Sequence, residues 1–188
     1  MEVPANVIGR RILVIGTAGA RKTTFATALS SRRGLPVVHL DLHYWRPGWV
    51  RPSEDEWREQ QQNLLSGDAW IAEGNYLGTL DLRLERAQDV ILLEAPWVTC
   101  ARRAFLRGIK RPAGWRPPAG CDDLISRRLR DEWGLVIAIC RDRGAEMERA
   151  RAIVAEGKHE AVLHVLGSNE ATGKFLAHLQ STTLADEG

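Results

Sequence analysis

One stretch near the start of the chain combines residue types and a spacing suited to holding phosphate. It reads GTAGARKTT at residues 16–24 and follows the apolar run Ile12–Ile15. Glycines let consecutive backbone N–H groups curl around a phosphate, and the N-terminus of a following helix adds the positive end of its dipole. Lys22 would reach the β- and γ-phosphates of a nucleotide, and Thr23 would offer its hydroxyl to Mg²⁺. The sequence therefore predicts binding of ATP and Mg²⁺. The residues predicted to hold them are Gly16, Gly19, Ala20, Arg21, Lys22, Thr23 and Thr24.

The position before Lys22 departs from the usual phosphate-loop pattern. The pattern G-x-x-x-x-G-K-[ST] has glycine where this chain has Arg21. Glycine there allows the backbone to approach the phosphate, or to adopt a conformation that other residues resist. Arg21 either clashes with the nucleotide or points outward and adds positive charge near the phosphates. The sequence leaves both open, beside an ordinary strand–turn–helix with a glycine turn.

Acidic side chains stand at the ends of two further predicted strands. Asp41 ends the run Pro36–Asp41, and Glu73 ends Trp70–Glu73. Strand ends of this kind form the edge of the sheet where α/β proteins bind ligands. Asp41 is a candidate to accept the proton of an acceptor hydroxyl, or to hold Mg²⁺ through water. Glu73 is a candidate to orient a water bound to Mg²⁺. The alternatives are a capping aspartate and a salt-bridged strand end.

Further side chains near these carboxylates are candidates for binding the acceptor. Trp45 and Trp49 flank Arg46 shortly after the second predicted strand. Two aromatic rings with a cation suit a flat, anionic or hydroxylated molecule, although such a loop also suits simple packing on the core. Asn75 is either a substrate ligand or a turn residue. Arg83 either grips substrate or phosphate, or is an exposed helix arginine.

An arginine-rich region follows the fourth predicted strand, between residues 102 and 143. Within it, the prolines and glycines of Lys110–Asp122 exclude a long regular helix. We expect a mobile lid at about residues 108–125. Arginines that close over a nucleotide stabilise the charge that spreads over the transferred phosphoryl group. The best lid candidates are Arg107, Arg111 and Arg116, each with a solvated surface position as its alternative.

The whole chain has the size and composition of one α/β domain, residues 1–188. It has 188 residues, of which 44% are apolar and 27% charged, which is typical of a soluble domain with one core. Apolar runs at 12–15, 36–41, 70–73, 89–93 and 161–166 alternate with helical stretches. This alternation predicts a five-stranded parallel sheet with helices on both faces. Residues 123–157 are expected to be helical, with breaks at Gly134 and Gly144.

Charge, hydropathy and cysteine spacing restrict the partners and the compartment. The net charge of +2 gives no general reason to bind nucleic acid. No apolar run approaches the roughly 18 residues that span a bilayer, so no membrane partner is expected. The three cysteines are never spaced as C-x-x-C and are expected to be free thiols in a reducing compartment. We therefore expect a cytoplasmic protein.

Four ordered segments together resemble a known family. They are the loop at 16–24 with its strand; HLD at 39–41 with YWRPGW at 44–49 and EW at 56–57; WIAEGNY at 70–76 with TLDLR at 79–83; and Val90–Glu94 with Pro96. Over about Arg10 to Leu179, the chain resembles the adenylate-kinase-like P-loop proteins called topology modulation protein (FlaR-like) kinases.

The resemblance implies a P-loop NTPase three-layer fold with strand order 2-3-1-4-5. It also implies ATP as phosphate donor and Mg²⁺ as cofactor, and it places the strand of Glu73 beside the strand of the phosphate loop. It implies no defined acceptor. Arg21 departs from the family pattern, and Glu73 and Glu94 stand where similar members carry Asp.

Three functions are compatible with these residues. The first is an ATP-dependent kinase that phosphorylates a hydroxyl or phosphate of a small molecule. The second is a non-catalytic scaffold, disabled by Arg21, that binds a protein or small ligand. The third is nucleic-acid binding through the arginine-rich region, which would weaken steeply with salt. A GTPase switch is not indicated, because the chain has no Asn-Lys-x-Asp segment for guanine.

Overall fold

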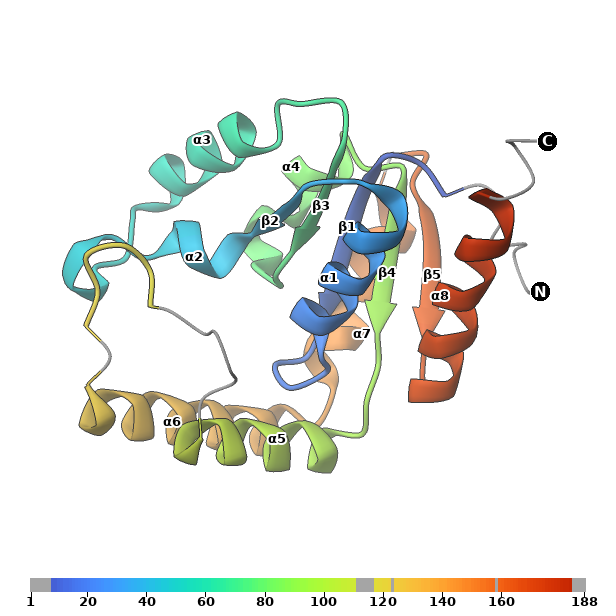
Figure 1. Ribbon diagram of the computed structural model, residues 1–188. Helices are drawn as coiled ribbons and strands as arrows, with labels where there is room; N and C mark the ends of the chain where they lie inside the picture. The colour runs from blue at the N-terminus through green and yellow to red at the C-terminus, as the bar shows by residue number, and fades with distance from the viewer. Residues whose placement is uncertain (1–7, 111–116, 123, 158, 184–188) are drawn as a thin grey trace.

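The computed structural model describes residues 8–110, 117–122, 124–157 and 159–183, without the side chains of 125–128 and 180–183. Five parallel strands form one sheet in the order β2-β3-β1-β4-β5 (Figure 1). The strands are β1 (Arg11–Gly16), β2 (Val37–His39), β3 (Trp70–Glu73), β4 (Asp89–Leu93) and β5 (Val162–Leu166). The predicted parallel sheet and its strand order are therefore confirmed.

Helices connect the strands and cover both faces of the sheet. They are α1 (Lys22–Arg33), α2 (Leu40–Tyr44), α3 (Glu54–Leu64), α4 (Leu80–Leu84), α5 (Trp97–Ile109), α6 (Ile125–Asp142), α7 (Ala145–Glu156) and α8 (Asn169–Thr183). Two 3-10 turns, η1 (Pro47–Trp49) and η2 (Leu77–Thr79), lie in the connections around β3. Among the described helices, none is both long enough and apolar enough to cross a bilayer.

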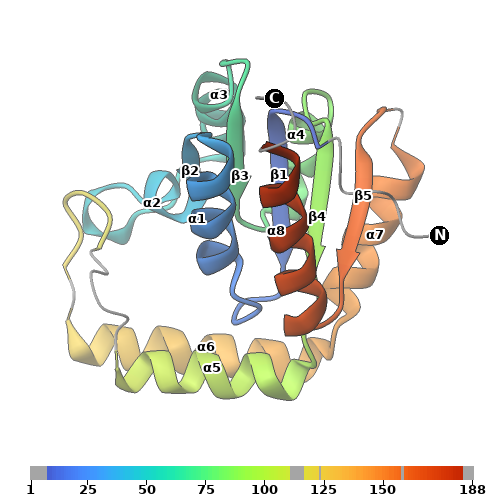
Figure 2. The ribbon, with the colours of Figure 1, turned by 45° about the vertical axis from the view of Figure 1, so that its right-hand side comes forward.

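The sheet separates two hydrophobic cores because successive strand residues point to opposite faces. On one face, Ile12 and Val14 of β1 pack with residues of α1 and α8. On the other, Leu13 and Ile15 pack with residues of α4 and α7. Figures 1 and 2 show α1 and α8 on the same face of the sheet. A strand buried on both faces must be apolar throughout, and that is why Ile12–Ile15 lacks alternation.

The structure corrects two predicted element boundaries. The second strand ends at His39, and Asp41 lies in the first turn of α2. Gly134 does not break the helical region, because α6 continues through it to Asp142. A glycine inside a helix costs only about 1 kcal/mol, which packing of the surrounding turns can offset. The predicted break at Gly144 is confirmed, and this residue has a φ of +105°.

Candidate active site

The predicted phosphate loop joins β1 to α1 at the carboxyl edge of the sheet. Lys22 Nζ donates to the carbonyl oxygen of Gly16 at 2.7 Å, and the N–H of Ala20 donates to Thr17 O at 2.9 Å. Gly19 has a φ of +89°, and a Cβ there would lie 2.6 Å from the carbonyl oxygen of Cys100. Only glycine fits between the loop and α5 at this position. The loop is therefore a tight turn with its lysine folded back over it.

Arg21 occupies the N-cap of α1 in the left-handed region, with φ 69° and ψ 32°. This conformation explains why a glycine is usual here, since an L side chain adopts it at a cost of roughly 1 kcal/mol. The Arg21 side chain is exposed and makes no capping hydrogen bond, and the first turn of α1 holds no acidic residue. The first N–H groups of a helix lack intrahelical acceptors. This end of α1 therefore suits an anion such as a phosphate.

Thr23, Glu73 and His39 meet beside the loop. The Thr23 hydroxyl donates to Glu73 Oε1 at 3.0 Å, and His39 Nδ1 lies 2.9 Å from the same oxygen. Because β2 pairs with β3 in parallel, His39 stands directly opposite Glu73 in the register. The Glu73 carboxylate is almost completely buried. The sheet thus positions the buried Glu73 carboxylate next to the hydroxyl of Thr23, the residue that follows Lys22.

The three groups shift one another's protonation. The hydrogen bond to Glu73 raises the pKa of His39, against the opposing effect of burial. Burial acts to raise the pKa of Glu73, but the His39 hydrogen bond, the Lys22 charge and the Thr23 hydroxyl together lower it. Glu73 is therefore an anion at neutral pH, although it is buried.

The donor set here fits a Mg²⁺ ion that accompanies a nucleotide. The Thr23 hydroxyl lies 3.0 Å from the Glu73 carboxylate. Both groups offer oxygen ligands of the kind that Mg²⁺ takes. Among the described residues, no group of three His, Cys, Asp or Glu side chains could hold a metal ion without such help. Nucleotide-bound Mg²⁺ needs only one or two protein ligands, because phosphates and water complete its shell.

Asp41 faces Tyr76 across the ends of β2 and β3. The Tyr76 hydroxyl donates to Asp41 Oδ1 at 2.7 Å, and Asp41 is exposed. Burial, followed by the Asp41 charge, raises the pKa of Tyr76 well above its usual value, so this hydroxyl keeps its proton. Asp41 is thus a solvent-accessible carboxylate with one oxygen fixed by a phenol.

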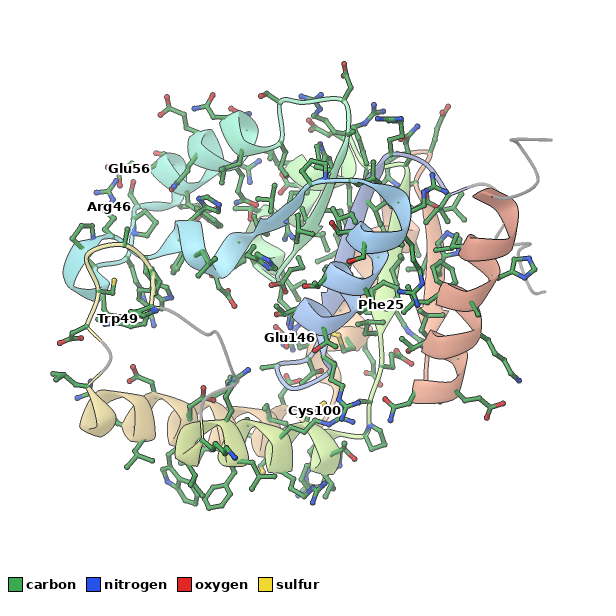
Figure 3. All side chains as sticks on the ribbon, in the orientation of Figure 1. Phe25, Arg46, Trp49, Glu56, Cys100 and Glu146 are labelled. Atoms are coloured by element: carbon green, nitrogen blue, oxygen red, sulfur yellow. The ribbon has the colours of Figure 1, made fainter. Side chains whose placement is uncertain are left out.

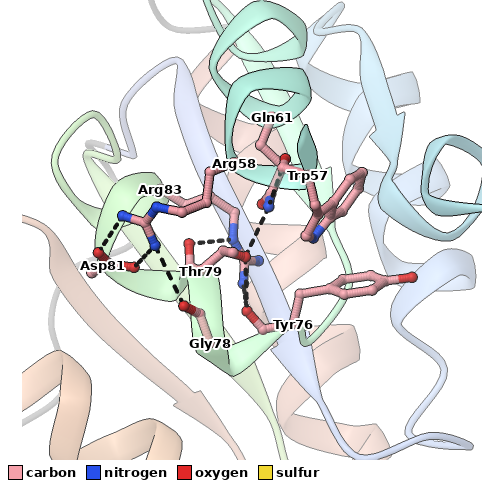
Figure 4. A network of polar contacts seen from close by, with 8 residues as sticks. All are labelled: Trp57, Arg58, Gln61, Tyr76, Gly78, Thr79, Asp81 and Arg83. Carbon is pink, nitrogen blue, oxygen red and sulfur yellow. Dashed lines mark hydrogen bonds and ion pairs between the residues drawn. The ribbon is translucent and has the colours of Figure 1, made fainter. Parts of the chain in front are cut away.

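Arg83 holds the segment that carries Tyr76. The alternative of an exposed helix arginine is wrong, because this side chain is fully buried. Its predicted grip on substrate or phosphate stays a prediction. Its guanidinium donates to the carbonyl oxygens of Gly74, Asn75 and Tyr76. Figure 4 shows the contact with Tyr76. Burial lowers the pKa of Arg83 to about 10, so it remains charged at neutral pH. Tyr76 has a φ of +38°, and these hydrogen bonds stabilise that left-handed backbone.

Asn75 contacts the phosphate loop itself. Its Oδ1 accepts a hydrogen bond from the backbone N–H of Gly16 at 3.0 Å, between residues 59 positions apart. The side chain therefore ties the end of β3 to the end of β1, where the loop begins. Its predicted contact with substrate stays a prediction.

Trp45, Arg46 and Trp49 lie on the connection between α2 and α3. Trp45 and Trp49 stack edge to face with ring centroids 5.6 Å apart. Arg46 pairs with Glu56 at 2.8 Å, and the two lie side by side in Figure 3. Hydrogen bonds from Arg46 and from Ser53 at the start of α3 lower the pKa of Glu56 to about 2. The connection is exposed or half-buried rather than packed into either core.

The described part of the predicted lid reaches this same connection. Trp49 Nε1 donates to Asp122 Oδ1 at 2.9 Å, and the N–H of Gly48 donates to Gly120 O at 3.0 Å. Residues 117–122 therefore lie against η1 (Figure 1). Arg111 and Arg116 lie outside the described residues.

Arg107 connects the two helices that flank the lid. Its guanidinium donates to both carboxylate oxygens of Glu132 in α6, at 2.7 and 2.8 Å. Burial acts to lower the pKa of Arg107, but the Glu132 hydrogen bonds and charge outweigh it. α5 ends at Ile109, so this helix carries Arg107 but does not extend to Arg111.

Sequence reasoning missed two residues that the fold brings to the loop. Arg103, one turn before Arg107 in α5, donates to the carbonyl oxygen of Gly19 at 3.0 Å. The sequence shows that Arg103 and Arg107 are four residues apart, but it does not show the contact of Arg103 with Gly19, which lies 84 positions away. His39 carried no predicted functional role, and its place opposite Glu73 in the register of β2 and β3 emerges only from the fold.

Comparisons with known proteins add a general likeness. No protein-family model matches the sequence, and no curated protein sequence is significantly similar. A gluconokinase from Sinorhizobium meliloti 1021 is 15% identical, with 96% of this chain and 97% of that chain covered and a TM-score of 0.49. A shikimate kinase from Acinetobacter baumannii in complex with shikimate is 18% identical, with 95% and 94% covered and a TM-score of 0.49.

A sugar kinase from Janibacter sp. HTCC2649, in an unliganded structure, is 15% identical, with 95% and 94% covered and a TM-score of 0.45. Scores and identities of this size carry no argument about activity or substrate. The fold assignment rests on the strand order and on the loop between β1 and α1.

Proposed function

We propose that the chain is a single-domain, cytoplasmic kinase of the topology modulation protein (FlaR-like) family. It transfers the γ-phosphoryl group of ATP to a hydroxyl or phosphate of a small molecule. One observation carries the proposal: the Thr23 hydroxyl, directly after the loop lysine, hydrogen-bonds the buried Glu73 carboxylate at the N-terminus of α1. An ordinary strand–turn–helix has no need of a buried carboxylate in that place.

The loop binds the phosphates of ATP in this proposal. Lys22 exchanges its hydrogen bond with Gly16 O for the β- and γ-phosphates, and N–H groups at the start of α1 bind phosphate oxygens. Arg21, exposed at the helix end, adds positive charge. Thr23 and Glu73 hold Mg²⁺, directly or through water. When bound, the ion neutralises charge on the phosphates.

Asp41 receives the acceptor in this proposal. Its free oxygen accepts the proton of the acceptor hydroxyl, while the Tyr76 hydrogen bond fixes the other oxygen. Trp45, Arg46 and Trp49 stand on the adjoining connection and bind the remainder of the acceptor. A phosphate acceptor would instead pair with the cations around the loop.

Arginines supply the electrostatic stabilisation that phosphoryl transfer requires. Arg103 already touches the loop through Gly19 O. Arg107, Arg111 and Arg116 remain the lid candidates, and Arg107 would have to leave Glu132 to reach a phosphate. We therefore place Arg103 beside them as a candidate that needs no rearrangement of α5.

The proposal is tested by calorimetric titration of ATP with and without Mg²⁺. The parent protein should bind ATP with micromolar to sub-millimolar affinity. Lys22→Ala should weaken binding at least about tenfold, because a charged contact to phosphate is removed. Glu73→Gln should weaken binding only when Mg²⁺ is present. Arg86→Ala, which changes an arginine bonded to Ser66 O away from the loop, serves as the matched control.

A specific observation favours a second candidate function. Arg21 stands where the phosphate-loop pattern has glycine, in a backbone conformation that glycine adopts more easily. The chain would then be a non-catalytic scaffold. Titration of Arg21→Gly separates the two: binding by this variant alone supports the scaffold, and binding by the parent rejects it. Failure of both folded proteins to bind would overturn the nucleotide site altogether.

A further inference from the structure

The α5–α6 hairpin exposes a row of apolar side chains on each helix. We call these residues the hairpin face: Val98, Phe105 and Ile109 of α5 with Leu129, Trp133 and Ile137 of α6. Their exposed fractions run from 37% for Ile137 to 57% for Ile109. Spacings of four and seven residues place each set along one side of its helix.

The α5 side of this face points away from the protein core. The buried residues of α5 are Cys100, Ala101, Ala104 and Gly108, which lie about a quarter of a turn around the helix from Phe105 and its neighbours. Small buried residues allow α5 to lie close to its support, while the large apolar residues remain outside. This reverses the usual pattern of a surface helix, which exposes polar residues.

The two apolar rows join across the hairpin. The rings of Phe105 and Trp133 lie with centroids 6.3 Å apart, edge to face. α5 and α6 run side by side in both ribbon views. The face is therefore one continuous surface formed by two helices.

The hairpin is anchored to the sheet at one end only. Ala101, Ala104 and Ile139 belong to the core beneath α1. Among the described residues, α5 and α6 contact each other more than either contacts any other element. The end of α5 near Ile109 extends away from the sheet (Figure 2). Helical structures are stable as two packed layers, and within the described part of the chain no second layer covers the hairpin face.

The size and composition of the face decide which partner fits. Six large side chains, 37–57% exposed, amount to on the order of several hundred Å² of apolar surface, comparable to the largest patch of an ordinary monomer. Together with a polar rim, the area of the hairpin face approaches the roughly 800 Å² that each partner buries in a stable protein interface. Trp133, Phe105 and Arg102, which lies between Val98 and Phe105 and is exposed, are residue types enriched at such interfaces.

We infer that two copies of this chain associate through their hairpin faces. A twofold axis through the face brings the same residues of each copy together. Two antiparallel hairpins packed in this way form a four-helix bundle, which supplies the missing layer. The interface lies on the outer side of α5, whose Arg103 contacts the phosphate loop. The inferred association of two copies does not depend on the proposed kinase activity.

The test is the mass of the protein in solution, measured by sedimentation velocity over a range of concentrations. At tens of micromolar the full chain should have twice its mass of 21.0 kDa. Trp133→Glu and Ile109→Glu should each raise the dimer dissociation constant at least about tenfold, since each places a charge in the buried centre. Val50→Glu is the matched control, because Val50 is 55% exposed and lies outside the face.

Circular dichroism and hydrogen exchange complete the test. Both glutamate variants should keep the helical signal of the parent, and amides of α5 and α6 should become more protected as parent concentration rises. A parent that stays monomeric at about 100 µM overturns the inference, as does a dimer that neither face variant weakens. A monomer that sediments with phosphatidylserine vesicles through Trp133 would also overturn it, in favour of a membrane surface.

Discussion

Two histidine–carboxylate pairs among the described residues stand on the same sheet in different surroundings. His39 Nδ1 lies 2.9 Å from Glu73 Oε1, and His164 Nε2 lies 2.6 Å from Asp89 Oδ1. The His39 side chain is 29% exposed, whereas that of His164 is 8% exposed. Each pair joins neighbouring parallel strands, β2 with β3 and β4 with β5. The chemistry is similar, so the position in the fold must separate their roles.

The neighbours of each pair show the difference. Glu73 also accepts a hydrogen bond from the Thr23 hydroxyl, and the Lys22 charge helps to lower its pKa, so this pair lies beside the predicted phosphate loop. Asp89 begins β4 at the opposite edge of the sheet and accepts from the backbone N–H of Gly9 at 2.7 Å. Its histidine packs on a ring of α8. The first pair is open to a ligand, and the second is closed into the core.

The largest expected effect comes from breaking the closed pair. Asp89→Ala should lower the free energy of unfolding by about 3 kcal/mol, because it leaves the buried His164 and the partly buried Gly9 N–H without their acceptor. Urea denaturation measures this loss. ATP binding by the folded fraction should be unchanged, since Asp89 is far from the loop edge of the sheet. A loss below about 1 kcal/mol would contradict a structural role for this pair.

A smaller, pH-dependent effect is expected from the open pair. The raised pKa of His39 makes its stabilisation complete below its ordinary value of 6.5 and lost as pH rises through the folded pKa. The lowered pKa of Glu73 makes its stabilisation complete above 4.5 and lost as pH falls through the folded pKa. His39→Gln should therefore lower the free energy of unfolding most between pH 4.5 and 6.5, and least at alkaline pH. Partial exposure screens the pair, so we expect about 1 kcal/mol at most.

Urea denaturation of the parent protein and of His39→Gln across a pH series measures how the difference in their free energies of unfolding depends on pH. His43→Gln is the control with the opposite sign. Burial lowers the pKa of His43, so protonation at acidic pH costs stability that this variant recovers. A flat pH profile for His39→Gln would show that the pair does not form as described.

The smallest effect concerns backbone strain, which is also found near the His39–Glu73 pair. Arg21 and Tyr76 both have positive φ there, at 69° and 38°. Arg21→Gly should raise the free energy of unfolding by about 0.5 kcal/mol, as strain is relieved while chain entropy opposes the gain. Arg143→Gly, at a second left-handed residue with φ 49° outside the site, should give a similar gain. Thermal unfolding of both variants measures it, and a destabilised Arg21→Gly would contradict the left-handed assignment.

The sequence by itself determined the elements that depend on neighbouring residues. Apolar runs such as Ile12–Ile15 predict buried strands, and the Ser53–Glu56 capping box marks the start of α3, as observed. The glycine-rich loop was placed correctly between β1 and α1 for the same reason. Turn geometry, capping and the period of apolar residues are local properties, so they can be read along the chain.

The tertiary structure alone decided which side chains meet. The contacts of Thr23 with Glu73, of Arg103 with Gly19 and of His39 with Glu73 join residues 50, 84 and 34 positions apart. They depend on strand order and register, which local pattern does not specify. Arg83 is a clear example: its sequence position suited either a substrate ligand or an exposed helix arginine, but in the fold it donates to three carbonyl groups that follow β3. Burial of a charge is decided by what surrounds it, and those neighbours come together only when the chain folds.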